Sequence, residues 1–303
     1  MPRSLSRTAR VMWRRLGTGL GLLLLVGAGV GLWITQADPL PDDALAGLEG
    51  DPESGARIFA AAGCASCHIA EDGPADVLSG GKRFATDFGT FVAPNISSDP
   101  VAGVGSWDDI ALANAILRGV SPDGQQYYPV FPYGAYNKMR DQDVIDLISY
   151  MRTLPASDIA SQPHDIAFPF SIRRLNGGWK TFAMVDDWTL QDPASDEIAQ
   201  GRYLVEALGH CAECHTPRNA IGGLDTAAWM TGAPFPAGEG RVPGITPSKL
   251  DWSVADIAEY LRSGFTPDFD SAGGEMAAVV RNTAKLTDAD RQAIASYLKA
   301  LPN

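Results

Sequence analysis

Hydrophobic positions are most concentrated in one uncharged run near the N-terminus. Residues 16–37 carry no charged side chain, and the centre of the run is almost entirely leucine, glycine and valine. About 20 apolar residues are enough to cross a bilayer as a helix. A signal peptide has the same overall pattern, but its apolar region is usually only about 7–15 residues long. We therefore expect residues 1–37 to form an uncleaved single-pass anchor, with a cleaved signal peptide as the open alternative.

Beyond this run, apolar residues recur three or four positions apart, which is the spacing of one helix face. Near the C-terminus, Thr287 and Asp290 have the spacing of a capping box ahead of such a face. An equivalent face precedes residue 155, and continuous alternation typical of strands is missing from the sequence. The pattern predicts an all-α protein in which these inward-facing residues form a core: Val144, Leu147, Ile148, Met151, Ile294, Tyr297 and Leu298.

The helical pattern occurs twice. Trp107 precedes Gly119 by twelve residues, and Trp252 precedes Gly264 by the same number. Segments ending in Leu-Pro close both copies, at Pro155 and at Pro302. The duplication predicts an anchor followed by two modules and their connections, with these boundaries: anchor 1–37, tether 38–50, module one 51–155, an ordered interdomain strap 156–194 and module two 195–303.

Each module contains one Cys-x-x-Cys-His motif near its start. The first motif consists of Cys64, Cys67 and His68, and the second consists of the matching residues Cys211, Cys214 and His215. Cysteines three residues apart share one face of a helix, so both can form thioethers with one porphyrin, and the histidine then faces the iron. A zinc site or a redox dithiol would not require the histidine next to the second cysteine in both copies. The chain has four cysteines, all in the motifs, so we predict two covalently bound haem c groups.

The ligands on the opposite side of each iron are less clear from the sequence. In module two we predict Met276, in a glycine-rich segment before the last helix, with Met230 as its rival. In module one Phe131 occupies the comparable region and cannot bind iron. Met139 is the nearest thioether, although it aligns with Leu286 of module two and therefore also has the pattern of a core residue. Met139 as ligand and a five-coordinate first haem both remain open.

Two histidines lie outside the motifs. His164 falls in the strap, where we expect a hydrogen-bonding or surface role in preference to iron ligation. His210 directly precedes Cys211, and we expect it to point away from the haem-bearing face into solvent.

Charge is distributed unevenly. The net charge is −12, yet residues 1–15 contain five arginines and no acid: Arg3, Arg7, Arg10, Arg14 and Arg15. By the positive-inside rule this cluster places the N-terminus in the cytoplasm and residues 38–303 outside it. The strongly acidic remainder argues against nucleic acid as a partner and is compatible with docking to a basic face of a redox protein.

A family resemblance rests on the motif segments and on residues 93–97, 103–107 and 131–133. Together these residues resemble membrane-anchored bacterial dihaem cytochromes c, similar to the cytochrome subunits of periplasmic alcohol and gluconate dehydrogenases. The resemblance implies two tandem class I cytochrome c-like domains on the periplasmic side of the inner membrane. It implies electron transfer from a dehydrogenase to quinone, another cytochrome or a terminal oxidase. This sequence departs from the family at Phe131, where many relatives have methionine. It also has two haem motifs, whereas many of the dehydrogenase subunits have three.

The alternative hypothesis is a dihaem enzyme, such as a peroxidase or small-molecule oxidase, whose first haem iron has an open coordination position. Its support is Phe131, which leaves the distal ligand of module one unassigned. A peroxidase also needs acid–base groups beside an open iron, and module one offers no convincing distal histidine. Whether the chain is itself an enzyme therefore stays undecided, with an electron-transfer protein or subunit favoured.

Overall fold

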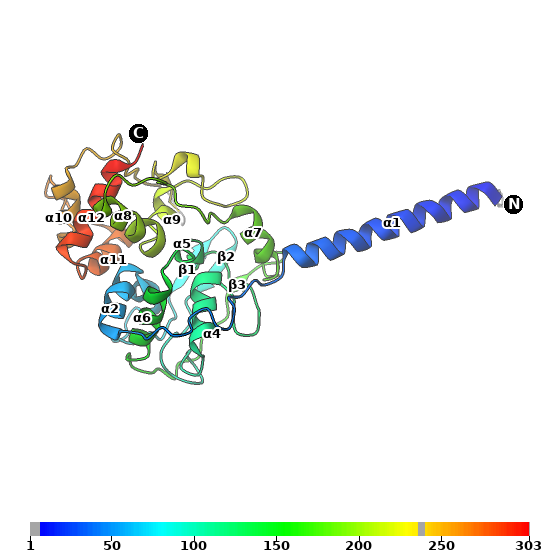
Figure 1. Cartoon of the computed structure of the whole chain (residues 1–303), viewed down its shortest axis with the longest axis horizontal. Helices are drawn as coiled ribbons and strands as arrows, with labels where there is room; N and C mark the ends of the chain where they lie inside the picture. Colours follow the sequence, from blue (N-terminus) through cyan, green and yellow to red (C-terminus); the bar gives the residue numbers. More distant parts are fainter. Residues whose placement is uncertain (1–6, 236–239, 303) are drawn as a thin grey trace.

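One long helix stands apart from the body of the molecule. The computed structural model describes residues 7–235 and 240–302. Helix α1 (Arg7–Ile34) projects freely from the folded part (Figure 1). Its segment Arg15–Ile34 is long and apolar enough to cross a membrane, a property that anchors and signal sequences share. Of the predicted arginine cluster, Arg3 lies outside the described residues.

Module one is built from short helices around a longer closing helix. Asp51 accepts a hydrogen bond from the Glu53 amide and Pro52 occupies the first turn, which explains why α2 begins where it does. The helices of this module are α2 (Pro52–Ala61), α3 (Cys64–His68), α4 (Asp109–Ala113), the π-helix η1 (Asn114–Arg118), α5 (Tyr133–Tyr136) and α6 (Asp141–Met151).

Module two repeats this plan, with longer helices in its second half. Thr287 and Asp290 form the predicted capping box, and Ser253 and Asp256 form a second one. Its elements are α8 (Asp196–Arg202), the π-helix η2 (Tyr203–Leu208), α9 (Ala212–His215), the 3-10 helix η3 (Thr226–Ala228), α10 (Val254–Ser263), α11 (Gly274–Thr283) and α12 (Asp288–Ala300).

The opening and closing helices pack closely in both modules. A Cβ on Gly55 would lie 2.0 Å from the Asp146 carbonyl oxygen, and one on Gly201 would lie 1.9 Å from that of Ala293. Gly201 is followed by one more residue before its cysteine motif than Gly55 is. The π-helix η2 accommodates that extra residue without displacing the motif.

Small antiparallel sheets accompany the helices. Strands β1 (Arg83–Thr86), β2 (Gly89–Val92) and β3 (Asp165–Ile166) form one sheet in that order, and β4 (Ala233–Pro234) pairs with β5 (Arg241–Val242). The helical class is confirmed, but these strands were not predicted. They are two to four residues long, too short to show alternation, and β3 comes from the strap, so its pairing is non-local.

Both modules share one hydrophobic core. All seven residues predicted to face inward are buried, from Val144 at 0% exposure to Met151 at 8%. The same cluster includes residues of α2, α6, η2 and α12, and Figure 1 shows the two modules stacked against each other with α7 (Leu175–Ala183) beside the point where α1 leaves the body. The modules therefore meet through apolar contact, which fixes how their two motifs face each other.

Candidate functional site

Both cysteine motifs lie on single helical turns. Cys64 and Cys67 belong to α3, while Cys211 precedes α9 and accepts a hydrogen bond from the His215 amide at 3.0 Å. Burial raises the pKa of Cys64 and that of Cys211 to about 12. Reactive dithiols have lowered thiol pKa values, so these surroundings argue against a redox dithiol. Within residues 7–235 and 240–302, no group of three or more metal-binding side chains suggests a zinc site.

Each motif histidine is oriented by a proline carbonyl. The Nδ1 atom of His68 lies 2.9 Å from the Pro94 oxygen, and that of His215 lies 2.8 Å from the Pro243 oxygen. A carbonyl only accepts, so Nδ1 carries the proton and Nε2 keeps its lone pair for a metal. Burial also lowers the pKa of both imidazoles, which favours the neutral, ligating form.

These residues fit haem c in both modules. Two sulfurs share one helical face next to a neutral imidazole whose Nε2 is free, which is the donor set that covalent haem requires. Haem supplies an iron that takes up and releases one electron. The role of the two prolines that orient the histidines could be assigned only from the structure.

The methionines predicted as distal ligands lie in different settings. Met276 is in the first turn of α11 and is half-buried, whereas its rival Met230 is fully buried. Met139 is 6% exposed and belongs to the shared core. It stands immediately before Arg140, the N-cap residue of α6, just as the buried Leu286 stands before Thr287, the N-cap residue of α12. Ligation by Met139 and Met276 remains a prediction.

The two motifs lie close together across the module interface. Asn282 of α11 donates to the Ser66 hydroxyl inside the first motif at 2.7 Å, and Lys82 pairs with Glu275 at 3.2 Å. A Cβ on Gly63, next to Cys64, would lie 3.9 Å from Nε2 of His210, next to Cys211. The helix that carries Met276 therefore contacts the first haem motif directly.

His210 does not point into solvent, so that prediction was wrong. Its ring meets the Tyr136 ring edge-on at 5.7 Å, and the Tyr136 hydroxyl donates to the Ala62 carbonyl at 2.6 Å. The backbone φ of His210 is +40°, and the matching Gly63 has φ +67°. Glycine adopts this left-handed region freely, whereas histidine does so at a cost in free energy. Contacts with module one hold His210 in this conformation.

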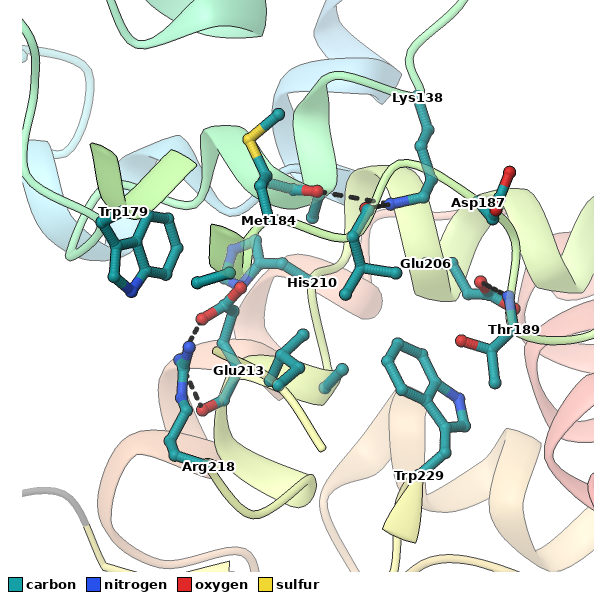
Figure 2. A pocket seen from close by; sticks show the side chains of 16 residues that line it. Lys138, Trp179, Met184, Asp187, Thr189, Glu206, His210, Glu213, Arg218 and Trp229 are labelled. Atoms are coloured by element: carbon teal, nitrogen blue, oxygen red, sulfur yellow. Dashed lines mark hydrogen bonds and ion pairs between the residues drawn. The ribbon is translucent and has the colours of Figure 1, made fainter. Parts of the chain in front are cut away.

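A small cavity of about 30 Å³ lies behind the second motif, between both modules and the strap. Figure 2 shows Lys138, Trp179, Glu206, His210 and Trp229 around it. The Lys138 ammonium donates to the Val185 carbonyl at 2.7 Å, and Figure 2 also shows the ion pair of Glu213 with Arg218. The strap thus contacts module one and module two at the same place.

Glu206 is a buried carboxylate that the sequence analysis missed. It is 3% exposed and accepts hydrogen bonds from the Thr189 amide at 2.7 Å, the Leu190 amide at 3.3 Å and the Tyr297 hydroxyl at 2.7 Å. The sequence did contain a sign of this role. Glu206 lies five residues before Cys211, whereas the equivalent position in module one, five residues before Cys64, is the apolar Phe59. An acid within an otherwise apolar helix indicates a specific polar partner.

His164 has the hydrogen-bonding role that was expected. Its Nδ1 atom accepts from the Val92 amide at 3.1 Å, and its ring packs edge-on against Phe91 and Tyr128. These contacts hold the strap against strand β2.

Two helical modules, each with a covalent haem motif and an oriented histidine, define a dihaem c-type cytochrome, a carrier of electrons. The cytochrome c family model matches residues 52–155 and 198–302, and the chain belongs to this family.

Known relatives share this organisation. The chain is 54% identical over 294 residues to a diheme cytochrome c-type protein of Cereibacter sphaeroides, covering 96% of this chain and 99% of the relative. It is 34% identical to the fructose dehydrogenase cytochrome subunit of Gluconobacter japonicus and 31% identical to the gluconate 2-dehydrogenase cytochrome c subunit of Pantoea cypripedii. Those matches cover 93% and 88% of this chain but only 58% and 61% of the two subunits. The relatives support electron transfer over the rival enzymatic reading.

Proposed function

We propose that this chain is a membrane-anchored dihaem cytochrome that receives electrons from a dehydrogenase on the periplasmic side of the inner membrane. It passes them to quinone, another cytochrome or a terminal oxidase. The observation that carries the proposal is the contact between α11 of module two and the first haem motif, made by Asn282 and Ser66. Because Gly63 and His210, the residues that precede the two motifs, also approach each other, haems bound to the two motifs would be neighbours that exchange electrons within the chain.

The donor class follows from the relatives. Cytochrome subunits of fructose, gluconate and alcohol dehydrogenases are similar to most of this chain. A dehydrogenase donor is therefore the best-supported partner, and the acidic surface gives it a charge to recognise. On this proposal Met276 completes the iron coordination of module two and Met139 that of module one, which keeps both haems as carriers.

Hydrogen bonds between the folded modules and the C-terminal end of α1 support retention of the anchor. Arg174 donates to the Leu32 carbonyl at 2.8 Å and to the Thr35 hydroxyl at 2.9 Å, and Thr181 donates to the Ile34 carbonyl at 3.2 Å. A Cβ on Gly177 would lie 2.5 Å from the Thr35 oxygen, so only glycine allows this approach. Cleavage after Ala37 would remove every one of these contacts.

The test uses membranes from cells that express the full chain. Fructose, gluconate and ethanol are added in turn while the α band of haem c is recorded. At least one substrate should reduce the haems, and membranes carrying the fourfold variant Cys64→Ser, Cys67→Ser, Cys211→Ser, Cys214→Ser should lack the signal. Haems that stay oxidised with all three substrates would contradict a donor of this class. Mass spectrometry of the extracted protein should find residues 1–37 still present.

A further inference from the structure

The surface around α7 is unusually apolar for an exposed part of this protein. Phe168 is 79% exposed and Phe182 is 68% exposed. Phe88 and Phe170, both about half exposed, pack against each other with ring centroids 4.9 Å apart. We call the following six exposed side chains the α7 patch: Phe88, Phe168, Phe170, Ile172, Leu175 and Phe182.

The α7 patch adjoins the end of the anchor. Leu175 and Phe182 are seven residues apart on α7 and therefore share one face of the helix. A different face of α7, more than a right angle away around the helix, carries Gly177, which touches Thr35, and Thr181, which donates to the Ile34 carbonyl. Figure 1 shows α7 beside the base of α1. If α1 crosses a bilayer up to Ile34, this helix lies at the depth of the lipid headgroups.

The charge of this segment also differs from that of the acidic body of the protein. Residues 166–185 contain no acid and three bases, Arg173, Arg174 and Lys180, in a chain of net charge −12. The Lys180 ammonium binds module one, where it donates to the Gly119 carbonyl at 2.8 Å and to the Gln126 side chain at 2.6 Å. Arg174 is exposed at the anchor junction, where its guanidinium also donates to the Leu32 carbonyl. Exposed aromatic and aliphatic side chains beside arginines match an anionic lipid surface, where apolar groups enter the interface and cations meet phosphate.

We propose that the α7 patch inserts into the outer leaflet of the same bilayer that α1 crosses, so that the strap is a second membrane contact. This inference rests on the proposed function, because it requires α1 to remain as an anchor. Two contacts restrict the rotation of the haem modules about α1. The second contact thereby holds them in one orientation toward a partner in the membrane, such as quinone or an oxidase.

The test places a nitroxide label on the full-length holoprotein in vesicles of phosphatidylethanolamine and phosphatidylglycerol. Because all four native cysteines are committed to haem, a new cysteine can be labelled singly. Three variants are compared: Phe182→Cys in the patch, Val101→Cys as an exposed control elsewhere, and Leu24→Cys within α1. Accessibility to oxygen and to a water-soluble nickel complex reports the depth of each label.

We expect the label at position 182 to lose nickel accessibility and gain oxygen accessibility in vesicles, while the label at position 101 stays fully accessible to nickel. Adding Phe168→Ser and Leu175→Ser should restore nickel access at position 182. A label at 182 in water with one at 24 in the bilayer would overturn the patch alone. A label at 24 in water would instead show that the anchor, and with it the proposed function, is wrong.

Discussion

The two modules have the same attachment chemistry but different surroundings. Both orient their motif histidine through a proline carbonyl, at Pro94 and at Pro243. Five residues before the first cysteine, however, module one has Phe59 packed on Tyr150 with ring centroids 5.2 Å apart, and module two has Glu206 bonded to Tyr297. The first arrangement is apolar and stays within module one, whereas the second also binds the strap. After duplication, the contacts that orient the motif histidine stayed the same in both modules. The contacts made by the helix that precedes the motif diverged, and in module two they bind the strap.

The largest expected effect comes from removing one attachment site at a time. Cys64→Ser with Cys67→Ser should leave one haem per chain, held by module two, and Cys211→Ser with Cys214→Ser should leave one held by module one. Each thioether pair is confined to its own helix turn, so neither loss should remove the other haem. A pyridine haemochrome assay measures the ratio. Unchanged stoichiometry in either variant would contradict the assignment of that motif.

The predicted distal ligands distinguish the modules next. Met276→Leu should turn the second haem high-spin and lower its reduction potential, because the thioether that favours the reduced iron is lost. Met139→Leu should do the same to the first haem. Its packing cost should stay below about 1.5 kcal/mol, since leucine occupies the matching position 286. Electron paramagnetic resonance and a redox titration provide the measurements. An unchanged spectrum for Met139→Leu would show that Met139 is only a core residue.

A third effect concerns the buried carboxylate. Glu206→Leu should reduce the free energy of unfolding by about 3 kcal/mol, because two strap amides and the Tyr297 hydroxyl lose their acceptor. The matched change Phe59→Leu should cost only about 1 kcal/mol, since it alters an apolar contact alone. Glu206→Gln keeps an acceptor and should lie between them. Urea unfolding of the haem-loaded protein measures all three, and equal losses at both positions would contradict the difference between the modules.

The smallest effect is a pH dependence at the strap. Burial, together with the nearby charge of Arg173, lowers the pKa of His164 below its ordinary value near 6.5. The unfolded chain then takes up the proton first, so this stability is complete above about pH 6.5 and is lost as the pH falls through the folded pKa. The loss should be small, below about 1 kcal/mol, because the ring is partly exposed to solvent. Urea unfolding between pH 7.5 and 5.5 gives the free energy of unfolding as a function of pH. This free energy should fall less with decreasing pH in His164→Asn than in the original protein, and an equal fall in both would refute the assignment.

Much of this organisation could be predicted from the sequence because it depends on local spacing. The capping box at Thr287, the inward face of α12 and both cysteine motifs require only neighbouring residues. Glu206, His210 and His164 depend instead on contacts between segments far apart in the chain. His210 was misjudged because its neighbour Tyr136 comes from the other module, a contact that no local pattern encodes. Strand β3 was missed for the same reason.

The central claim is that two haems lie close enough within one chain to exchange electrons directly. A pulse of reductant giving less than one electron per protein, followed optically, tests this claim most directly. We predict that the electron redistributes between the haems at a rate that does not change when the protein is diluted. A rate that falls in proportion to protein concentration would mean that electrons pass between separate molecules, and it would contradict the account.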